Sequence, residues 1–201
     1  HMDFDLDDDG IEDIQLFALK VNLASDIRIQ NCRFEDFDHL SAASFKSSSF
    51  LVQQTTFTNE LLVRRMLADD ITPIADTRSG YAQFLVFESS RGSIVGSKFI
   101  ANAPQGELSG GAIRILGNDG DYTISQSTFE GNQARQGGAL SVEGPIKNIS
   151  IENSTFSGNI AVTNGGAIYF GNESVSETAI INRTIFEENQ AQTGGAIFYC
   201  E

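Results

Sequence analysis

An acidic stretch near the N-terminus has the residue types and the spacing of a cation site. Carboxylates alternate along Asp5-Leu-Asp7-Asp-Asp9-Gly-Ile-Glu-Asp13. Alternate carboxylates can direct their oxygens at one hard cation such as Ca²⁺, and the glycine permits the sharp turn between them. We therefore predict a calcium site formed by Asp5, Asp7, Asp9 and Asp13. The loop departs from an EF-hand because Leu16 replaces the glutamate at the twelfth position, and the alternative is an acidic, solvated leader.

A long insertion at residues 59–78 is the second candidate for a functional site. It places Arg64 and Arg65 in an otherwise acidic chain, and long loops on a rigid scaffold often carry binding residues. The apolar residues around these arginines, followed by Pro73, are typical of a short helix that ends before the proline. We predict that Arg64 and Arg65 bind a partner. The alternative is a helix that covers one flank of the hydrophobic core.

The net charge excludes one broad class of partner. The chain has 13 Lys and Arg residues against 27 Asp and Glu residues, which gives a formal charge of -14. Such a chain repels nucleic-acid phosphates and anionic lipid headgroups. No apolar run approaches the roughly 18 residues that a membrane-spanning helix requires. We therefore expect no nucleic-acid partner, and we expect any membrane anchor of the full-length protein to lie outside this sequence.

An internal repeat predicts the strands that must position the candidate site residues. Six segments share a template in which an aliphatic residue stands five positions before a phenylalanine and a small residue stands two positions before it. Apolar residues that alternate and then give way to polar ones predict a strand with one buried face, followed by a bend. The template phenylalanines are Phe34, Phe57, Phe99, Phe129, Phe156 and Phe186, and the small residues are Cys32, Thr55, Ser97, Ser127, Ser154 and Thr184.

Two further motifs follow the phenylalanine in the later repeats. Asparagine stands three positions after it in four cases, and a Gly-Gly-Ala-Ile/Leu segment follows. Equivalent phenylalanines one coil apart can stack, equivalent asparagines can form amide ladders, and glycine pairs allow turns or close approaches. Less regular copies at residues 16–21, 41–45 and 80–86 extend the pattern toward the N-terminus. The Gly-Gly segments begin at Gly110, Gly137, Gly165 and Gly194, at spacings of 27, 28 and 29 residues.

This repeat predicts an all-β fold, a right-handed parallel β-helix (solenoid) of about six coils with one long loop insertion at residues 59–78. We assign residues 1–201 to one β-helix domain of a longer protein, with a tag remnant and an acidic leader at residues 1–13. Cys32 and Cys200 should lie roughly 30 Å apart, since strands stack at about 4.8 Å per coil. We therefore predict no disulfide between them, and we predict that Cys32 is a small core residue.

Four alternating copies of Phe-x-x-Asn and Gly-Gly-Ala-Ile/Leu resemble the repeats of the chlamydial polymorphic membrane proteins. The resemblance covers residues 92–201 well and residues 14–91 weakly. It implies a secreted β-helical passenger region, carried to the cell surface by the autotransporter route and active in adhesion to host cells. The segment from Asp5 to Asp13 also resembles calcium-binding repeats of the thrombospondin type. We accordingly expect a cell-surface, outer-membrane or secreted location, with calcium as the candidate cofactor.

A catalytic set is hard to assemble from this sequence. Carbohydrate-active β-helices need carboxylates beside Lys, Arg or His on one face, but His39 is the only histidine outside the cloning remnant. We therefore predict a non-enzymatic adhesin fragment that binds a host or cell-surface protein or glycan. The alternative is a carbohydrate-active or carbohydrate-binding β-helix, such as a lyase, hydrolase or epimerase. Outward or turn positions are predicted for Glu130, Glu152, Glu187 and Glu188.

Overall fold

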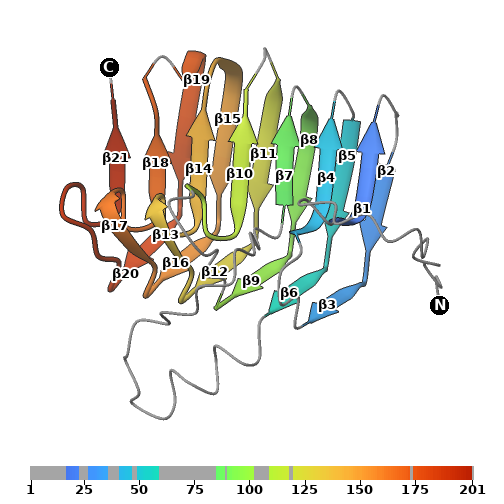
Figure 1. Ribbon diagram of the computed structural model, residues 1–201, viewed down its shortest axis with the longest axis horizontal. Helices are drawn as coiled ribbons and strands as arrows, with labels where there is room; N and C mark the ends of the chain where they lie inside the picture. The colour runs from blue at the N-terminus through green and yellow to red at the C-terminus, as the bar shows by residue number, and fades with distance from the viewer. Residues whose placement is uncertain are drawn as a thin grey trace, which may run out of the picture.

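The chain folds as a stack of β-coils. The computed structural model describes residues 17–22, 27–35, 41–46, 49–58, 85–88, 90–101, 109–117, 120–172 and 174–200. Each complete coil within these residues contributes one strand to each of three parallel sheets, which we name sheets A, B and C (Figure 1). The described ranges contain no helix that is long and apolar enough to span a membrane.

The strands of each sheet follow one another in chain order, so each coil stacks on the one before it. Sheet A contains β1 (Phe17–Asn22), β4 (Ser41–Lys46), β7 (Leu85–Glu88), β10 (Ile113–Leu116), β14 (Leu140–Glu143), β18 (Ile168–Phe170) and β21 (Ile197–Tyr199). Sheet B contains β2 (Ile27–Gln30), β5 (Ser49–Gln53), β8 (Arg91–Val95), β11 (Asp121–Ser125), β15 (Ile146–Glu152) and β19 (Val175–Asn182). Sheet C contains β3 (Arg33–Glu35), β6 (Thr56–Thr58), β9 (Lys98–Ile100), β12 (Thr128–Glu130), β16 (Thr155–Ser157) and β20 (Ile185–Glu187), while β13 (Gln133–Gln136) pairs with β17 (Ile160–Asn164).

The phenylalanine positions form a column inside the stack, as the repeat predicts. Neighbouring rings lie parallel, and the closest pair, Phe129 and Phe156, has ring centroids 4.5 Å apart and an interplanar angle of 4°. Phe99 stacks on the other face of Phe129 at 4.8 Å. All three side chains are fully buried, so the column contributes both apolar burial and ring stacking to the core.

The less regular N-terminal repeats join the same sheet as the Gly-Gly-Ala-Ile segments. Ile113 pairs in register with Leu140 of the next coil and with Leu85 of the preceding one. Leu85 in turn pairs with Ala43. The predicted all-β, right-handed parallel β-helix is therefore confirmed, and three six- or seven-stranded sheets correspond to six complete coils.

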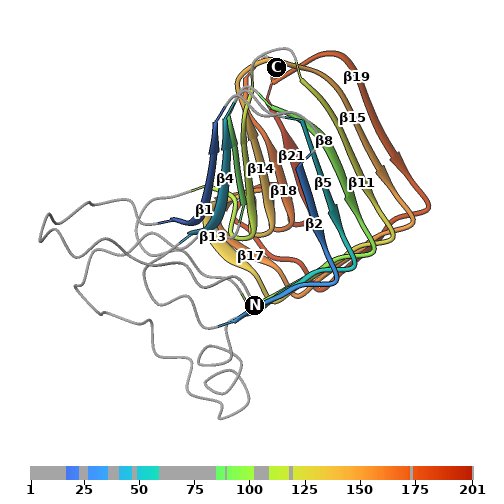
Figure 2. The same ribbon diagram turned by 90° about the vertical axis from the view of Figure 1, so that its right-hand side faces the viewer.

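The described turns between the strands contain residues in the left-handed backbone region. In one coil these are Gln126 between sheets B and C, Gly131 after sheet C and Gly137 before sheet A, with φ values of 52°, 63° and 60°. Sheets A, B and C form the sides of a three-sided outline that is visible along the stack (Figure 2). The second glycine of the motif serves a close approach, because a Cβ on Gly138 would lie 2.2 Å from the carbonyl oxygen of Gly166 in the next coil.

Buried asparagines link the coils through their side chains, as predicted. The Nδ2 group of Asn132 donates to Oδ1 of Asn159 at 2.9 Å, and Nδ2 of Asn159 donates to Oδ1 of Asn189 at 2.9 Å. The Asn102 position of this series lies outside the described residues. This amide ladder satisfies polar groups that burial would otherwise leave without partners.

The position of Cys32 in the first described coil differs from its prediction. Cys32 occupies the Ser/Thr position of the template, and its Sγ donates to the carbonyl oxygen of Gln30 at 3.3 Å. The prediction that Cys32 is a small core residue is nevertheless wrong, because the side chain is exposed. It belongs to the first described coil, so no described coil covers it on that side. Cys32 and Cys200 are both free thiols.

Candidate functional site

The outer face of sheet A brings together chemically versatile side chains from successive coils. Along β10, β14, β18 and β21, the residues that follow the Ile/Leu of each motif pair with one another in register. Strand alternation turns them away from the core, since the residues next to them in β10, β14 and β18, and Ile197 in β21, belong to the apolar interior or pack against it. This row consists of Arg114, Ser141, Tyr169 and Phe198.

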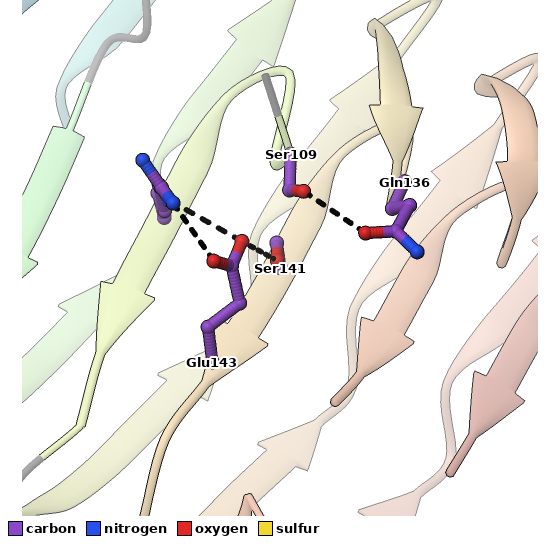
Figure 3. Close-up of polar contacts among 5 residues, drawn as sticks. Ser109, Gln136, Ser141 and Glu143 are labelled. Carbon is purple, nitrogen blue, oxygen red and sulfur yellow. Dashed lines mark hydrogen bonds and ion pairs between the residues drawn. The ribbon is translucent and has the colours of Figure 1, made fainter. Parts of the chain in front are cut away.

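An ion pair joins two coils at one end of this row. The Arg114 guanidinium donates to both carboxylate oxygens of Glu143, at 2.8 Å and 3.3 Å. Ser141 Oγ donates to Glu143 Oε1 at 2.8 Å, so the carboxylate is held from two sides (Figure 3). About a quarter of each charged side chain is exposed, 26% for Arg114 and 27% for Glu143. The pair is therefore ordered and still accessible to a partner.

These contacts keep Glu143 in its ionised form. Burial by itself would raise the pKa of Glu143, but hydrogen bonds from Arg114 and Ser141, the charge of Arg114 and a smaller contribution from Ser109 hold the pKa below its usual value. A carboxylate that is already ionised and paired is a weak proton acceptor. The pair is accordingly better suited to recognition than to general acid–base catalysis.

Polar groups border the row where the chain enters sheet A. Ser109 Oγ donates to Gln136 Oε1 at 3.3 Å (Figure 3), and the two residues also form a parallel β-bridge. Gln136 ends β13, the strand directly before the Gly137 turn. The half-buried Gln136 amide can exchange hydrogen bonds with a bound molecule, whereas Ser109 is buried and orders the site from within.

Two aromatic rings continue the row toward the last coil. Tyr169 and Phe198 stack with ring centroids 5.8 Å apart and an interplanar angle of 11°. Both side chains are only half-buried. Burial, followed by the nearby Cys200 thiol, raises the pKa of Tyr169, so its hydroxyl stays protonated at neutral pH. We name the set Arg114, Glu143, Ser141, Ser109, Gln136, Tyr169 and Phe198 the A-face cluster.

The outer face of sheet B is polar and acidic by contrast. Asn148 Nδ2 donates to Asp121 Oδ1 at 2.8 Å and to Glu177 Oε2 at 3.5 Å, so this amide bridges two carboxylates from the coils on either side of its own. Glu152 accepts a hydrogen bond from Ser150 on the same strand at 2.8 Å. These groups satisfy one another along the stack, as solvated strand faces commonly do.

The site residues predicted from the sequence lie elsewhere. Asp5, Asp7, Asp9 and Asp13, the insertion 59–78 with Arg64 and Arg65, and His39 all fall outside the described residues. In the part of the chain that the structure describes, no group of three or more His, Cys, Asp or Glu side chains could hold a metal ion. The prediction of outward or turn positions for acidic residues is confirmed, since Glu130, Glu187 and Glu188 are exposed and Glu152 is half-buried.

The A-face cluster was not predicted, although the sequence of the repeats contains a signal for it. In each Gly-Gly-Ala-Ile/Leu motif the residue after the aliphatic one must point outward once the motif is assigned to a strand. At that position the chain carries Arg114, Ser141, Tyr169 and Phe198, a set rich in arginine and aromatic residues. Comparing the variable positions between the repeats would therefore have located this row.

Comparison with known proteins identifies the family and no individual relative. A search of curated proteins and a search of solved structures each returned no match. Residues 11–200 match the family described as right handed beta helix region, and the match spans all the described strands. The three parallel sheets and the coil-by-coil register agree with that description. The chain belongs to the right-handed β-helix family.

Proposed function

We propose that this chain is a non-enzymatic binding scaffold of the adhesin type, exposed at a cell surface or secreted, with the A-face cluster as its partner-binding surface. The observation that carries the proposal is the row on sheet A in which Arg114, Tyr169 and Phe198 are partly exposed. Arginine and aromatic residues contribute most to binding at protein interfaces. A host or cell-surface protein is the partner that this composition favours.

Rigidity supports the same proposal. Arg114, Ser141, Glu143 and Tyr169 lie on β10, β14 and β18, which are hydrogen-bonded on both sides by neighbouring coils. The charged pair is fixed by two guanidinium contacts and one hydroxyl contact. A surface fixed in this way loses little conformational freedom when it binds. The resemblance to the chlamydial polymorphic membrane proteins points in the same direction, toward a passenger region that adheres to host cells.

Carbohydrate binding is the second candidate, and the Tyr169–Phe198 stack favours it. Half-buried rings beside the Gln136 amide and the Arg114 guanidinium can contact both the apolar and the polar faces of a sugar. Right-handed β-helices also serve as scaffolds for carbohydrate-active enzymes. The ionised, paired state of Glu143 argues for binding without turnover, since this carboxylate lacks the raised pKa of a general acid.

The test uses cell binding, a glycan array and a polysaccharide turnover assay with the same proteins. We expect the chain to bind host cells and the double variant Tyr169→Ala/Phe198→Ala to bind at least 10-fold more weakly. Lys98→Ala, an exposed change on sheet C, should leave binding unchanged. Circular dichroism and melting temperature would establish that the variants are folded. Selective glycan binding without cell-protein binding would favour the second candidate, and turnover of any polysaccharide would refute the non-enzymatic proposal.

A further inference from the structure

The acceptor sites of the Glu143 carboxylate are used within the A-face cluster. Its Oε1 atom accepts from Arg114 Nε at 3.3 Å and from Ser141 Oγ at 2.8 Å, and its Oε2 atom accepts from Arg114 Nη2 at 2.8 Å. A hydrogen bond from the Ser109 side chain also contributes to lowering the pKa of Glu143. Because a carboxylate has about four acceptor sites, these contacts leave Glu143 little capacity to accept from a ligand.

Arg114 by contrast keeps unused donors. Its guanidinium has N–H groups on Nε, Nη1 and Nη2. Glu143 binds Nε and Nη2, whereas Nη1 has no hydrogen-bond partner among the residues that the structure describes. About a quarter of the Arg114 side chain is exposed. The edge formed by Nη1 and the second Nη2 hydrogen therefore keeps its donors for a ligand.

Neighbouring groups add further donors on the same face. Gln136 Oε1 accepts from Ser109 Oγ at 3.3 Å, so the Nε2 group of Gln136 points away from this serine (Figure 3). Burial raises the pKa of Tyr169, so its hydroxyl stays protonated and has an O–H to donate. The face thus offers more donors than acceptors, and the ligand group that suits it best is an acceptor.

We infer that Arg114 binds a side-chain carboxylate of the partner protein through Nη1 and Nη2, so that the guanidinium bridges this carboxylate and Glu143. The inference rests on the proposed function, because it concerns the same surface and the same class of partner. A carboxylate fits the planar donor pair of arginine with two parallel hydrogen bonds. A carboxylate is also favoured over a doubly charged phosphate, because Glu143 would repel the second negative charge as well.

The aromatic part of the row adds a second requirement for the partner. Tyr169 lies two coils from Arg114 in the register of sheet A, which places their backbones about 10 Å apart. Ser141, which lies between them in the row, is fully buried, so no long side chain separates the two. The partner segment therefore carries an Asp or Glu next to an apolar side chain that packs on the Tyr169 ring.

The first experiment compares variants of the whole chain in the host-cell binding assay. Arg114→Gln/Glu143→Gln removes both charges of the pair together, so neither is left unpaired, and should bind about 10-fold more weakly. Arg114→Lys keeps the charge but loses the planar donor pair and should also bind more weakly. The control Arg91→Gln removes an exposed arginine of β8 on sheet B and should bind like the unmodified chain. Melting temperatures establish that the variants are folded.

The second experiment identifies the source of the carboxylate on the cells. Cells whose surface carboxylates have been converted to amides with carbodiimide and ethanolamine should bind the unmodified chain about 10-fold more weakly. The residual binding of Arg114→Gln/Glu143→Gln should not respond to this treatment. Cells treated with sialidase and glycosaminoglycan lyases lose their acidic sugars and should still bind. Loss of binding after the enzyme treatment would overturn the inference, because it would assign the carboxylate to a glycan.

The remaining outcomes separate this inference from the proposed function. Normal binding by Arg114→Gln/Glu143→Gln, or normal binding to the amidated cells, would overturn the carboxylate contact. If Tyr169→Ala/Phe198→Ala still weakened binding in that case, the proposed function would stand and only the inference would fail. Binding that responds to neither pair of substitutions, or the absence of any binding to host cells, would refute both.

Discussion

Asn159 accepts two hydrogen bonds from Asn132 through a single side-chain oxygen, one from the backbone N–H at 3.0 Å and one from the side-chain amide at 2.9 Å. Its own amide donates to the carbonyl oxygen of Phe129 at 3.0 Å. One fully buried side chain therefore serves three polar groups at the corner after sheet C. The corner holds its shape through this side chain, because the groups it serves have no access to water.

Replacing Asn159 by leucine should destabilise the chain strongly. The change keeps the branched shape and the number of heavy atoms of the side chain. It leaves the Asn132 backbone donor and the Phe129 carbonyl without this partner, at a cost of about 3 kcal/mol or more. Urea denaturation followed by circular dichroism measures this loss. Asn172→Ser, at an exposed turn, is the control and should change the free energy of unfolding by less than about 0.5 kcal/mol. Similar losses for both variants would contradict the role assigned to the ladder.

Two glycines, Gly138 and Gly158, differ in how much room a side chain would have at their backbone positions. Gly138→Ala should prevent folding or melt the adjoining coils, because its Cβ would meet the Gly166 carbonyl oxygen at 2.2 Å and the Ile160 backbone nitrogen at 2.7 Å. Gly158→Asn should cost less than about 1 kcal/mol, since asparagine tolerates a positive φ and the nearest atom lies 4.0 Å away. Expression level and melting temperature distinguish the two. A well-folded Gly138→Ala variant would show that the coils can separate locally.

The sequence predicts this fold well because stacking makes the repeat visible. A phenylalanine such as Phe156 must recur once per coil, since a ring that lacks a partner above or below it leaves part of the core unfilled. The small residue before it and the asparagine after it must recur for the same reason. Exposure of Cys32 could not be predicted from the template, because it depends on which side of the coil another coil covers.

The A-face cluster was harder to predict because its residues do not repeat. Arg114 and Glu143 come from different coils and stand at different positions of their strands, so no single repeat contains the pair. Their contact depends on the register between β10 and β14. Aligning the motifs gives this register, but the alignment alone does not show which side chains are in contact. Function in a solenoid lies in such variable positions, whereas the conspicuous repeated positions carry the packing.

The acidic segment at the N-terminus gives a prediction that rests on its sequence pattern. Alternate carboxylates at Asp5, Asp7 and Asp9 suit Ca²⁺ better than Mg²⁺, which demands a stricter geometry. We expect millimolar calcium to raise the melting temperature relative to chelator and Asp7→Ala/Asp9→Ala to remove this increase. The variant Asp69→Ala/Asp70→Ala alters an acidic pair in the insertion and serves as the control. An unchanged melting temperature with calcium would refute the predicted site.

Lowering the pH should weaken the contact between Arg114 and Glu143. The folded-state pKa of Glu143 is lower than its usual value, so its contribution to stability is complete above the unfolded-state pKa of about 4.3 and is lost as pH falls through the folded-state pKa. Glu143→Gln should therefore cost about 1 kcal/mol at pH 7 and progressively less toward pH 3. Urea denaturation of both proteins at several pH values measures this difference.

A second variant tests whether Arg114 causes this pH dependence. In an Arg114→Met background the guanidinium is absent, so Glu143→Gln should cost less at pH 7 and its cost should vary less with pH. The difference between the two backgrounds is the coupling energy of the pair, which a double-mutant cycle isolates because the residues are in direct contact. Equal costs in both backgrounds would assign the pH dependence to the Ser141 hydrogen bond, the other short contact of the carboxylate.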